Sequence, residues 1–224
     1  LGIARSHNGA VALSRNGKIV SAIQAERISG QKRQSVLLCK RDKALVTECV
    51  KYCLNQAGIV HADIQSIAIC TPWNVEKIQN KDLFDYIGGT PNEYRETYYV
   101  PHHLSHMEYI LHYSESDPGI VLVVDGSGSK EEDRKHFNIH EEASPTCISH
   151  IHTTGKETLS SYWFDGRRTS LIYRLSSKYR DFGRSTKSDP LTKKFLQSIG
   201  HYWVWASLYC CGSQFEAGKV MGLA

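Results

Sequence analysis

Long apolar runs are missing from this sequence of 224 residues, and none approaches the roughly 20 residues that a membrane-spanning helix requires. No charged segment followed by an apolar one opens the chain, so we predict no secretory signal peptide. A strong charge of one sign is lacking too, because 27 basic and 23 acidic side chains leave a formal net charge of +4. This mild charge favours small anionic ligands and does not indicate a nucleic-acid-binding protein. We therefore expect a cytoplasmic protein without membrane or nucleic-acid partners.

Paired cysteines are also absent: the seven cysteines are an odd number and contain no Cys-x-x-Cys motif. Cys49 and Cys53 share one face of a predicted helix, and Cys39 and Cys70 lie in apolar surroundings. Reduced, mostly buried thiols explain these positions better than disulfides do. With 41% hydrophobic and 22% charged residues, the chain has the composition of a folded protein.

The most informative motif is Pro-His-His-Leu-Ser-His at residues 101–106, followed by a predicted strand that ends in Asp125. His102 and His106 are four residues apart, so both lie on one face of a helix and can bind one ion. The apolar run at 119–124 predicts a strand buried on both faces, which places Asp125 at the carboxyl end of the sheet. Two imidazoles and one carboxylate form the facial triad of non-haem Fe(II) sites, and Zn or Mn also fits. A half-buried histidine pair without metal is the alternative.

The histidine helix also excludes one class of metalloenzyme. Pro101 suits the first turn of this helix. In His-Glu-x-x-His proteases the glutamate is the general base, and here His103 occupies that position, which argues against a zinc peptidase. We expect the buried side of the helix to consist of Leu104, Tyr109, Ile110 and Tyr113.

The order of predicted elements indicates the fold class. Three strands in a meander open the chain at 1–6, 10–14 and 18–25, with a tight turn at Arg15-Asn16-Gly17. A helix over about 43–56, closed by Gly58, and a strand over 64–70 follow.

At Gly119 the same order begins again. We expect strands at 120–125, 135–140 and 147–153, then a strand at 158–163 and helices around 168–180 and 190–209. The repeat predicts two subdomains, 1–118 and 119–224, with the second one incomplete. Such a duplicated β-β-β-α unit is the plan of the actin-like ATPase superfamily, with ribonuclease H-like subdomains and mixed sheets flanked by helices in an α/β fold.

Polar loops follow the first strand of each half, Ser6-His7-Asn8-Gly9 in one and Asp125-Gly126-Ser127-Gly128 in the other. The second loop offers backbone N–H groups and two glycines, which let an anion approach, although a tight turn is the simpler explanation. Gly218, Lys219 and Gly222 form a second glycine cluster, which suits either a nucleotide or close helix packing.

These motifs occur together in an order that resembles one family. The order is Leu-Gly-Ile with His7-Asn-Gly-Ala, Glu26-Arg27 with Lys32, His-His-Leu-Ser-His, Val-Val-Asp-Gly-Ser-Gly and Gly-Lys-Val-Met-Gly-Leu-Ala. The chain resembles the carbamoyltransferase family that includes nodulation protein U and the antibiotic O-carbamoyltransferases. It departs from that family at Asn8 and Ser129, where acidic residues are common.

The resemblance implies a reaction and its cofactors. Enzymes of this family use carbamoyl phosphate and ATP to make a carbamoyl-adenylate, and pass the carbamoyl group to a hydroxyl of a small-molecule or natural-product acceptor. By analogy, His102, His106 and Asp125 hold Fe(2+), His7 acts as general base or positions the acceptor, and Lys32 offsets negative charge on the adenylate. Gly126, Ser127 and Gly128 line the phosphates, and Gly218, Lys219 and Gly222 approach the nucleotide.

The resemblance also implies that the chain is the N-terminal part of a catalytic domain. We expect the C-terminal half of that domain, a further metal ligand and an adenylate-forming domain to lie outside it, so that the chain alone is inactive. Two alternatives stay open: a non-catalytic truncated actin-like binding module, and a metal-dependent small-molecule kinase of the same superfold. The acceptor, the identity of the metal and the oligomeric state, a homodimer included, also stay open.

Overall fold

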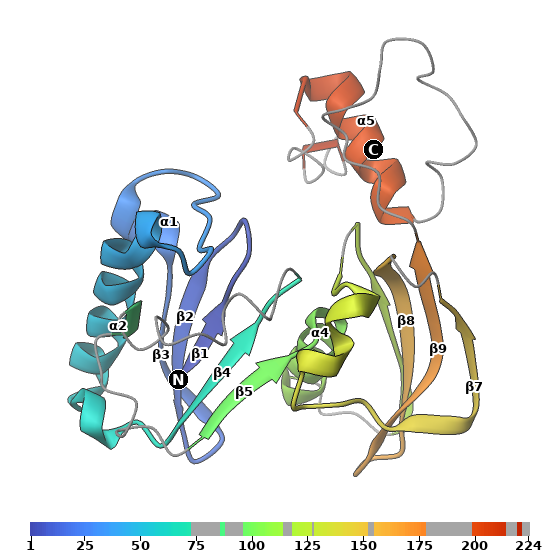
Figure 1. Cartoon of the computed structure of the whole chain (residues 1–224), viewed down its shortest axis with the longest axis horizontal. Helices are drawn as coiled ribbons and strands as arrows, with labels where there is room; N and C mark the ends of the chain where they lie inside the picture. The colour runs from blue at the N-terminus through green and yellow to red at the C-terminus, as the bar shows by residue number, and fades with distance from the viewer. Residues whose placement is uncertain are drawn as a thin grey trace. The chain divides into compact units, whose positions relative to one another are not determined.

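The computed structural model describes residues 1–72, 86–87, 96–113, 118–126, 128–151, 155–177, 199–213 and 219–220. The chain divides into two compact units, Leu1–His102 with Asp133–His140 and His103–Glu132 with Glu141–Ala224. Each unit is built on one mixed β-sheet, which confirms an α/β fold with mixed sheets flanked by helices (Figure 1). Among the helices described, none is both long enough and apolar enough to cross a membrane.

The first unit contains a five-stranded sheet with the order β3-β2-β1-β4-β5. Strands β1 to β3 form an antiparallel meander, and β4 and β5 run parallel to β1. Asn16 and Gly17 have positive φ angles of 51° and 74°, as a tight hairpin turn requires. The predicted opening meander and its turn are confirmed. The strands are β1 (Gly2–Ala4), β2 (Ala10–Arg15), β3 (Lys18–Gln24), β4 (Ser66–Cys70) and β5 (Glu96–Val100).

Helix α2 (Lys43–Ala57) supplies much of the core of this unit, and α1 (Ala25–Ser29) lies close to it. Gly58 ends α2 in the left-handed conformation, with φ at 65° and its N–H donating to Leu54 and Asn55 carbonyls, as the sequence predicts. One face of α2 packs against the apolar side of the sheet. Its buried residues are Val46, Cys49, Val50, Cys53 and Leu54, which join Ile3, Val11, Ile67 and Ile69 of the strands. Two short 3-10 helices, η1 (Lys40–Asp42) and η2 (His61–Asp63), flank α2.

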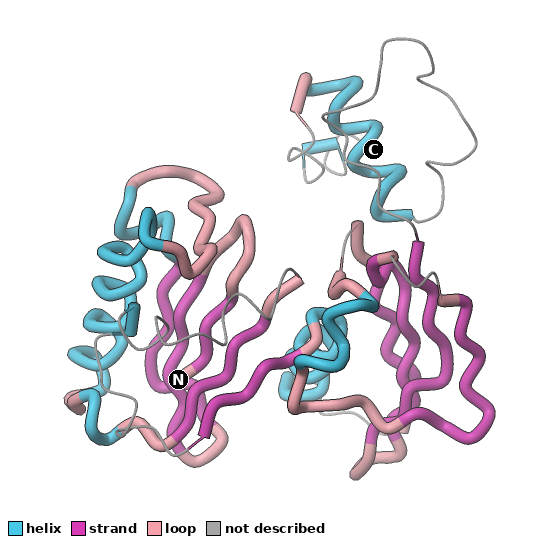
Figure 2. Tube along the Cα trace, in the orientation of Figure 1, coloured by secondary structure: helices cyan, strands magenta, loops and turns pink. Residues whose placement is uncertain are grey.

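The second unit contains a four-stranded sheet with the order β6-β8-β9-β7. Figure 2 draws the strands in magenta in the orientation of Figure 1. Strands β6, β8 and β9 pair antiparallel, and β7 joins the outer edge of β9 in parallel. The remaining elements in chain order are α4 (His102–Tyr113), β6 (Gly119–Val124), the 3-10 helix η4 (Glu131–His136), β7 (Ala143–His150), β8 (Lys156–Phe164), β9 (Thr169–Ser177) and α5 (Ile199–Cys211). Most of η4, from Asp133 on, belongs to the first unit.

Several predictions for the second half of the chain are wrong. The strand predicted at 135–140 is absent, because residues 131–136 form η4 and residues 137–140 form a loop. Residues 169–177 form strand β9 and not a helix, because they pair with β8 and β7 on both sides and because Thr169, Ile172 and Tyr173 favour strands over helices. Helix α5 agrees with the prediction for 190–209 from Ile199 onward, and residues 190–198 lie outside the described part.

The burial predicted for two elements, β6 and α4, is right in part: Val123 of β6 and Leu104 of α4 are buried as predicted. Strand β6 is an edge strand, and Ile120 and Leu122 on one of its faces are 65% and 57% exposed, whereas Val123 on the other is buried. A continuous apolar run does not reveal which faces of a strand are covered. On helix α4, the predicted Tyr109 and Ile110 are exposed. The buried face of α4 consists of His103, Leu104 and Met107.

The buried thiol of Cys49 predicts a pH dependence of stability. Burial, followed by the neighbouring Cys53 and Glu48, raises the pKa of Cys49 from 9.0 to about 11. Between these values the folded state keeps its proton and the unfolded state loses it, so stability is complete below about pH 9 and falls as pH rises toward 11. One proton changes the free energy of unfolding by about 1.4 kcal/mol per pH unit. We expect denaturant unfolding between pH 8 and 11 to show this slope.

Cys49→Ala should flatten that slope, although its stability at pH 8 is lower because a small cavity forms. Cys210→Ala is the control, since Cys210 is exposed. An equally steep slope in Cys49→Ala would show that Cys49 does not cause the alkaline loss of stability.

Candidate metal centre

Helix α4 sets the positions of the two candidate histidine ligands. Strand β5 ends at Val100, Pro101 is buried, and α4 starts directly at His102. His106 lies one turn further along, so both imidazoles project from the same side of the helix. The predicted histidine helix is therefore present, with its first histidine at the first helical position.

Asp125 follows the last residue of β6 and comes close to these histidines. One ligand atom from each of His102, His106 and Asp125 lies within 4.8 Å of the others. His102 and Asp125 are half-buried and His106 is exposed, which leaves one side of the group open to solvent. Donor atoms around one ion lie about 3.4 Å apart when each bond is about 2.1 Å, so small side-chain rotations would close the group around a metal. The donor set of two imidazoles and one carboxylate fits Fe(II), Zn or Mn.

Cys70 orients the first histidine. Its sulfur lies 3.5 Å from Nδ1 of His102, because Cys70 ends β4 beside Val100 at the end of β5. A proton on Nδ1, donated to this sulfur, leaves the lone pair of Nε2 for a metal. The sequence offers no indication of this contact, since it depends on the pairing of β4 with β5.

The loop after β6 is tied to strand β8 by its backbone. Asp125 N–H donates to the carbonyl of Thr158 over 3.1 Å, and Gly128 N–H donates to the carbonyl of Glu157 over 2.7 Å. Ser129 N–H donates to the carboxylate of Glu157 over 3.1 Å. Three N–H groups of this loop are thus committed within the fold. That Gly128 lines a phosphate stays a prediction, and the N–H of Gly128 already donates to Glu157.

Helix α5 approaches the same loop at Gly200. A Cβ atom on Gly200 would lie 2.4 Å from the nitrogen of Gly126 and 2.5 Å from the carbonyl carbon of Asp125. These backbone atoms cannot give way without moving the loop itself. Glycine at position 200 is therefore a condition for the observed approach of α5 to the aspartate.

The other predicted site residues lie elsewhere in the chain. His7 is exposed in the turn between β1 and β2, where Asn8 N–H donates to the hydroxyl of Ser6 over 3.1 Å. Lys32 is exposed in the loop after α1, and Lys219 is exposed in a short helical turn. Ser127, Gly218 and Gly222 lie outside the described residues.

Arg5 is a buried charge next to the His7 turn that the sequence did not single out. Its Nε donates to the carbonyl of Leu37 over 2.7 Å, and its Nη1 donates to the hydroxyl of Thr71 over 3.0 Å. Burial lowers its pKa, and the nearby carboxylate of Asp42 acts in the opposite direction. Arg5 thus ties the end of β1 to the segments after α1 and β4. In the sequence, the position of Arg5 directly between an apolar strand and a polar loop could have indicated that this arginine is buried.

Comparison with known proteins supports the predicted relationship. No family model matches the chain. Its sequence is 25% identical over 143 residues to nodulation protein NolNO of Sinorhizobium fredii, a match that covers 54% of this chain and 20% of the relative. The match thus spans a fifth of the length of that relative. The predicted resemblance to a family that includes nodulation proteins agrees with this match to a nodulation protein.

The close approach at Gly200 predicts the effect of a single methyl group. Gly200→Ala should push α5 away from the Asp125 loop and destabilise the second unit by about 1–3 kcal/mol, the usual cost of overpacking. Gly2→Ala is the control, because a Cβ there meets nothing closer than 3.8 Å. Thermal unfolding should show a lower midpoint for Gly200→Ala alone. Equal midpoints would mean that α5 does not pack against this loop in solution.

Proposed function

We propose that this chain is part of a metal-dependent carbamoyltransferase. In the proposed reaction, water cleaves carbamoyl phosphate to carbamate and phosphate, and an oxygen of the carbamate then attacks the α-phosphorus of ATP to form a carbamoyl-adenylate with release of pyrophosphate. The carbamoyl group then passes to the hydroxyl of a small-molecule acceptor and AMP is released. The observation that carries the proposal is the convergence of His102, His106 and Asp125 in a chain related to a nodulation protein.

In this proposal the triad holds one divalent ion, Fe(2+) by family analogy. The ion supplies Lewis acidity and a template for phosphate oxygens. Neutral His102 and His106 add no charge and Asp125 adds one negative charge, so the loaded site keeps a net charge of about +1. That charge favours an anionic phosphate over a neutral ligand. The exposed side of His106 is where such a ligand would enter.

The remaining roles follow from family analogy and belong to the same proposal. His7 accepts the proton of the acceptor hydroxyl or positions the acceptor, and Lys32 offsets charge on the adenylate. Both side chains are exposed, as groups that meet a diffusing substrate must be. The loop at Gly126 and Ser127 and the cluster at Gly218, Lys219 and Gly222 would lie near the nucleotide phosphates, in an actin-like arrangement of two ribonuclease H-like subdomains.

The triad predicts a specific loss of metal binding. Titration with Co(II), followed by its visible absorption, should show one site per chain. His106→Ala and Asp125→Asn should each weaken it at least about 100-fold, because removing a direct ligand costs more than the 10- to 100-fold typical of residues around the ligands. His112→Ala is the matched control, since His112 is an exposed histidine of the same helix. Equal binding by all three variants would place the metal elsewhere or nowhere.

The activity test uses the whole protein that contains residues 1–224, with carbamoyl phosphate, ATP and a panel of hydroxyl acceptors. We expect pyrophosphate, AMP and a carbamoylated product, and loss of all three in Asp125→Asn. Residues 1–224 alone should give no turnover. Acceptor-dependent ADP in place of AMP would support the kinase instead. Metal binding without any consumption of ATP would support the alternative of a non-catalytic actin-like binding module.

A further inference from the structure

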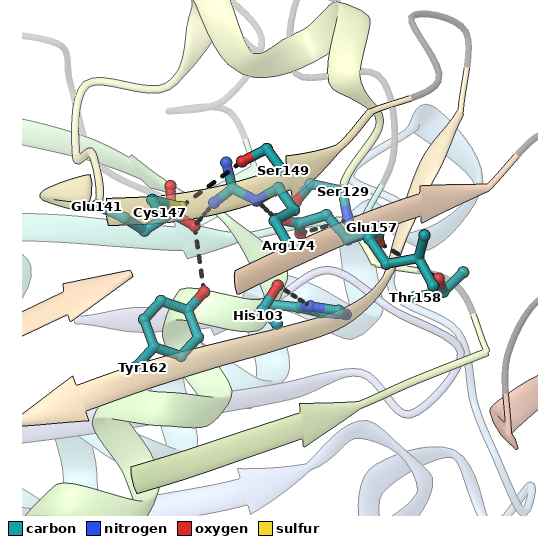
Figure 3. Close-up of polar contacts among 11 residues, drawn as sticks. His103, Ser129, Glu141, Cys147, Ser149, Glu157, Thr158, Tyr162 and Arg174 are labelled. Carbon is teal, nitrogen blue, oxygen red and sulfur yellow. Dashed lines mark hydrogen bonds and ion pairs between the residues drawn. The ribbon is translucent and has the colours of Figure 1, made fainter. Parts of the chain in front are cut away.

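The buried side of the second sheet carries an unusual group of charges. Arg174 on β9 lies between two glutamates (Figure 3). Its Nη2 is 2.7 Å from Oε1 of Glu141, and its Nε is 3.5 Å from Oε1 of Glu157. The side chains of Arg174, Glu141 and Glu157 are only 8%, 6% and 0% exposed. Two carboxylates and one guanidinium thus lie inside the protein.

A buried group of three charges is not expected to stabilise the fold more than apolar side chains would. Removing charges from water costs several kcal/mol per ion, and apolar side chains of equal volume often stabilise a core as well or better. Glu141 has a further donor, because the hydroxyl of Tyr162 lies 3.2 Å from its Oε1. Burial and then the two carboxylates raise the pKa of Tyr162, so it stays a neutral donor. The other carboxylate, Glu157, also accepts a hydrogen bond from a donor outside this sheet.

That donor is the loop that carries Asp125. Oε2 of Glu157 accepts from Ser129 N–H over 3.1 Å. The backbone of Glu157 binds the loop twice more, by accepting from Gly128 N–H over 2.7 Å and by donating to the carbonyl of Ser129 over 3.0 Å. Glu157 therefore holds the loop from Gly128 to Ser129 by three hydrogen bonds, just after the metal-ligating position.

Helix α4 is fixed to the same strand by His103, which lies between the two candidate ligands His102 and His106 in the sequence of the helix. Nδ1 of His103 lies 2.8 Å from the hydroxyl of Ser160 on β8, and both side chains are fully buried. The ring packs so tightly on Gly128 that a Cβ there would lie 2.7 Å from its Nε2 and 2.8 Å from Cβ of Glu157. Strand β8 thus contacts both the helix that carries the two histidines and the loop that carries Asp125.

We propose that Glu157, oriented by Arg174, is a positioning residue for the metal centre: it sets the loop of Asp125 at the distance from helix α4 that one ion requires. The inference rests on the proposed metal site and adds the group that holds it in place. The hydrogen bond to Ser129 N–H performs the positioning, and the negative charge of Glu157 does not act on the metal directly.

Two conservative variants separate these roles, and both keep the side chain close in size. Glu157→Gln keeps an oxygen at the same reach for Ser129 N–H, and Arg174 keeps its shorter contact with Glu141. Glu157→Asp keeps the charge and withdraws the carboxylate by one methylene. Leu171→Ala is the control, because it removes buried packing on β9 opposite Tyr162, five residues along β8 from Glu157.

The measurements are the affinity for Co(II), the visible spectrum of the bound Co(II) and the thermal midpoint. We expect Glu157→Asp to bind Co(II) at least tenfold more weakly with a changed spectrum, and Glu157→Gln to stay within about threefold of the unsubstituted protein. Leu171→Ala should lower the thermal midpoint and leave affinity and spectrum unchanged.

Three results would overturn the inference. Unchanged affinity in both Glu157 variants would make the group structural only, with the metal site and the proposed function intact. A Glu157→Gln protein as weak as or weaker than Glu157→Asp would assign the effect to charge. A protein without substitutions that binds no Co(II) would remove the metal site, and with it both the proposed function and this inference.

Discussion

Strand β8 is the support on which the candidate site depends. It accepts the N–H of Asp125 at Thr158, holds the following loop at Glu157 and fixes helix α4 through Ser160. A metal ligand set tolerates errors of a few tenths of an ångström, and side chains from a helix and a loop meet that tolerance only when a rigid element holds both. A nine-residue strand paired on both sides is such an element.

The same support explains why the buried side of this sheet is polar. Ser160, Glu157 and Arg174 occupy positions that Val or Leu would fill in an ordinary sheet, and each contacts another polar group. The arrangement gives up apolar burial, worth about 25 cal/mol per Å². It gains directed bonds to the loop and to α4, which apolar packing does not provide. The first unit contrasts with it, because its sheet packs an apolar face on α2.

Much of the first unit could be predicted from the sequence because its elements are defined locally. The Asn16-Gly17 turn specifies a hairpin, and Gly58 specifies the end of α2. The second unit could not be predicted as well. Strand β9 is a strand because two neighbours pair with it, and the exposed face of β6 depends on the edge position of that strand. Such facts are set by residues far away in the sequence.

For the candidate site, too, the features within one element could be predicted from the sequence and the contacts between elements could not. The sequence by itself determined that His102 and His106 share a helix face, since four residues make about one turn, and that Asp125 follows a strand. Only the tertiary structure decided that the aspartate meets the histidines, that Cys70 lies against His102, and that Glu157 and Gly200 enclose the loop. Local spacing fixes geometry within one element, whereas the distance between elements depends on strand pairing and on glycine positions that allow close approach.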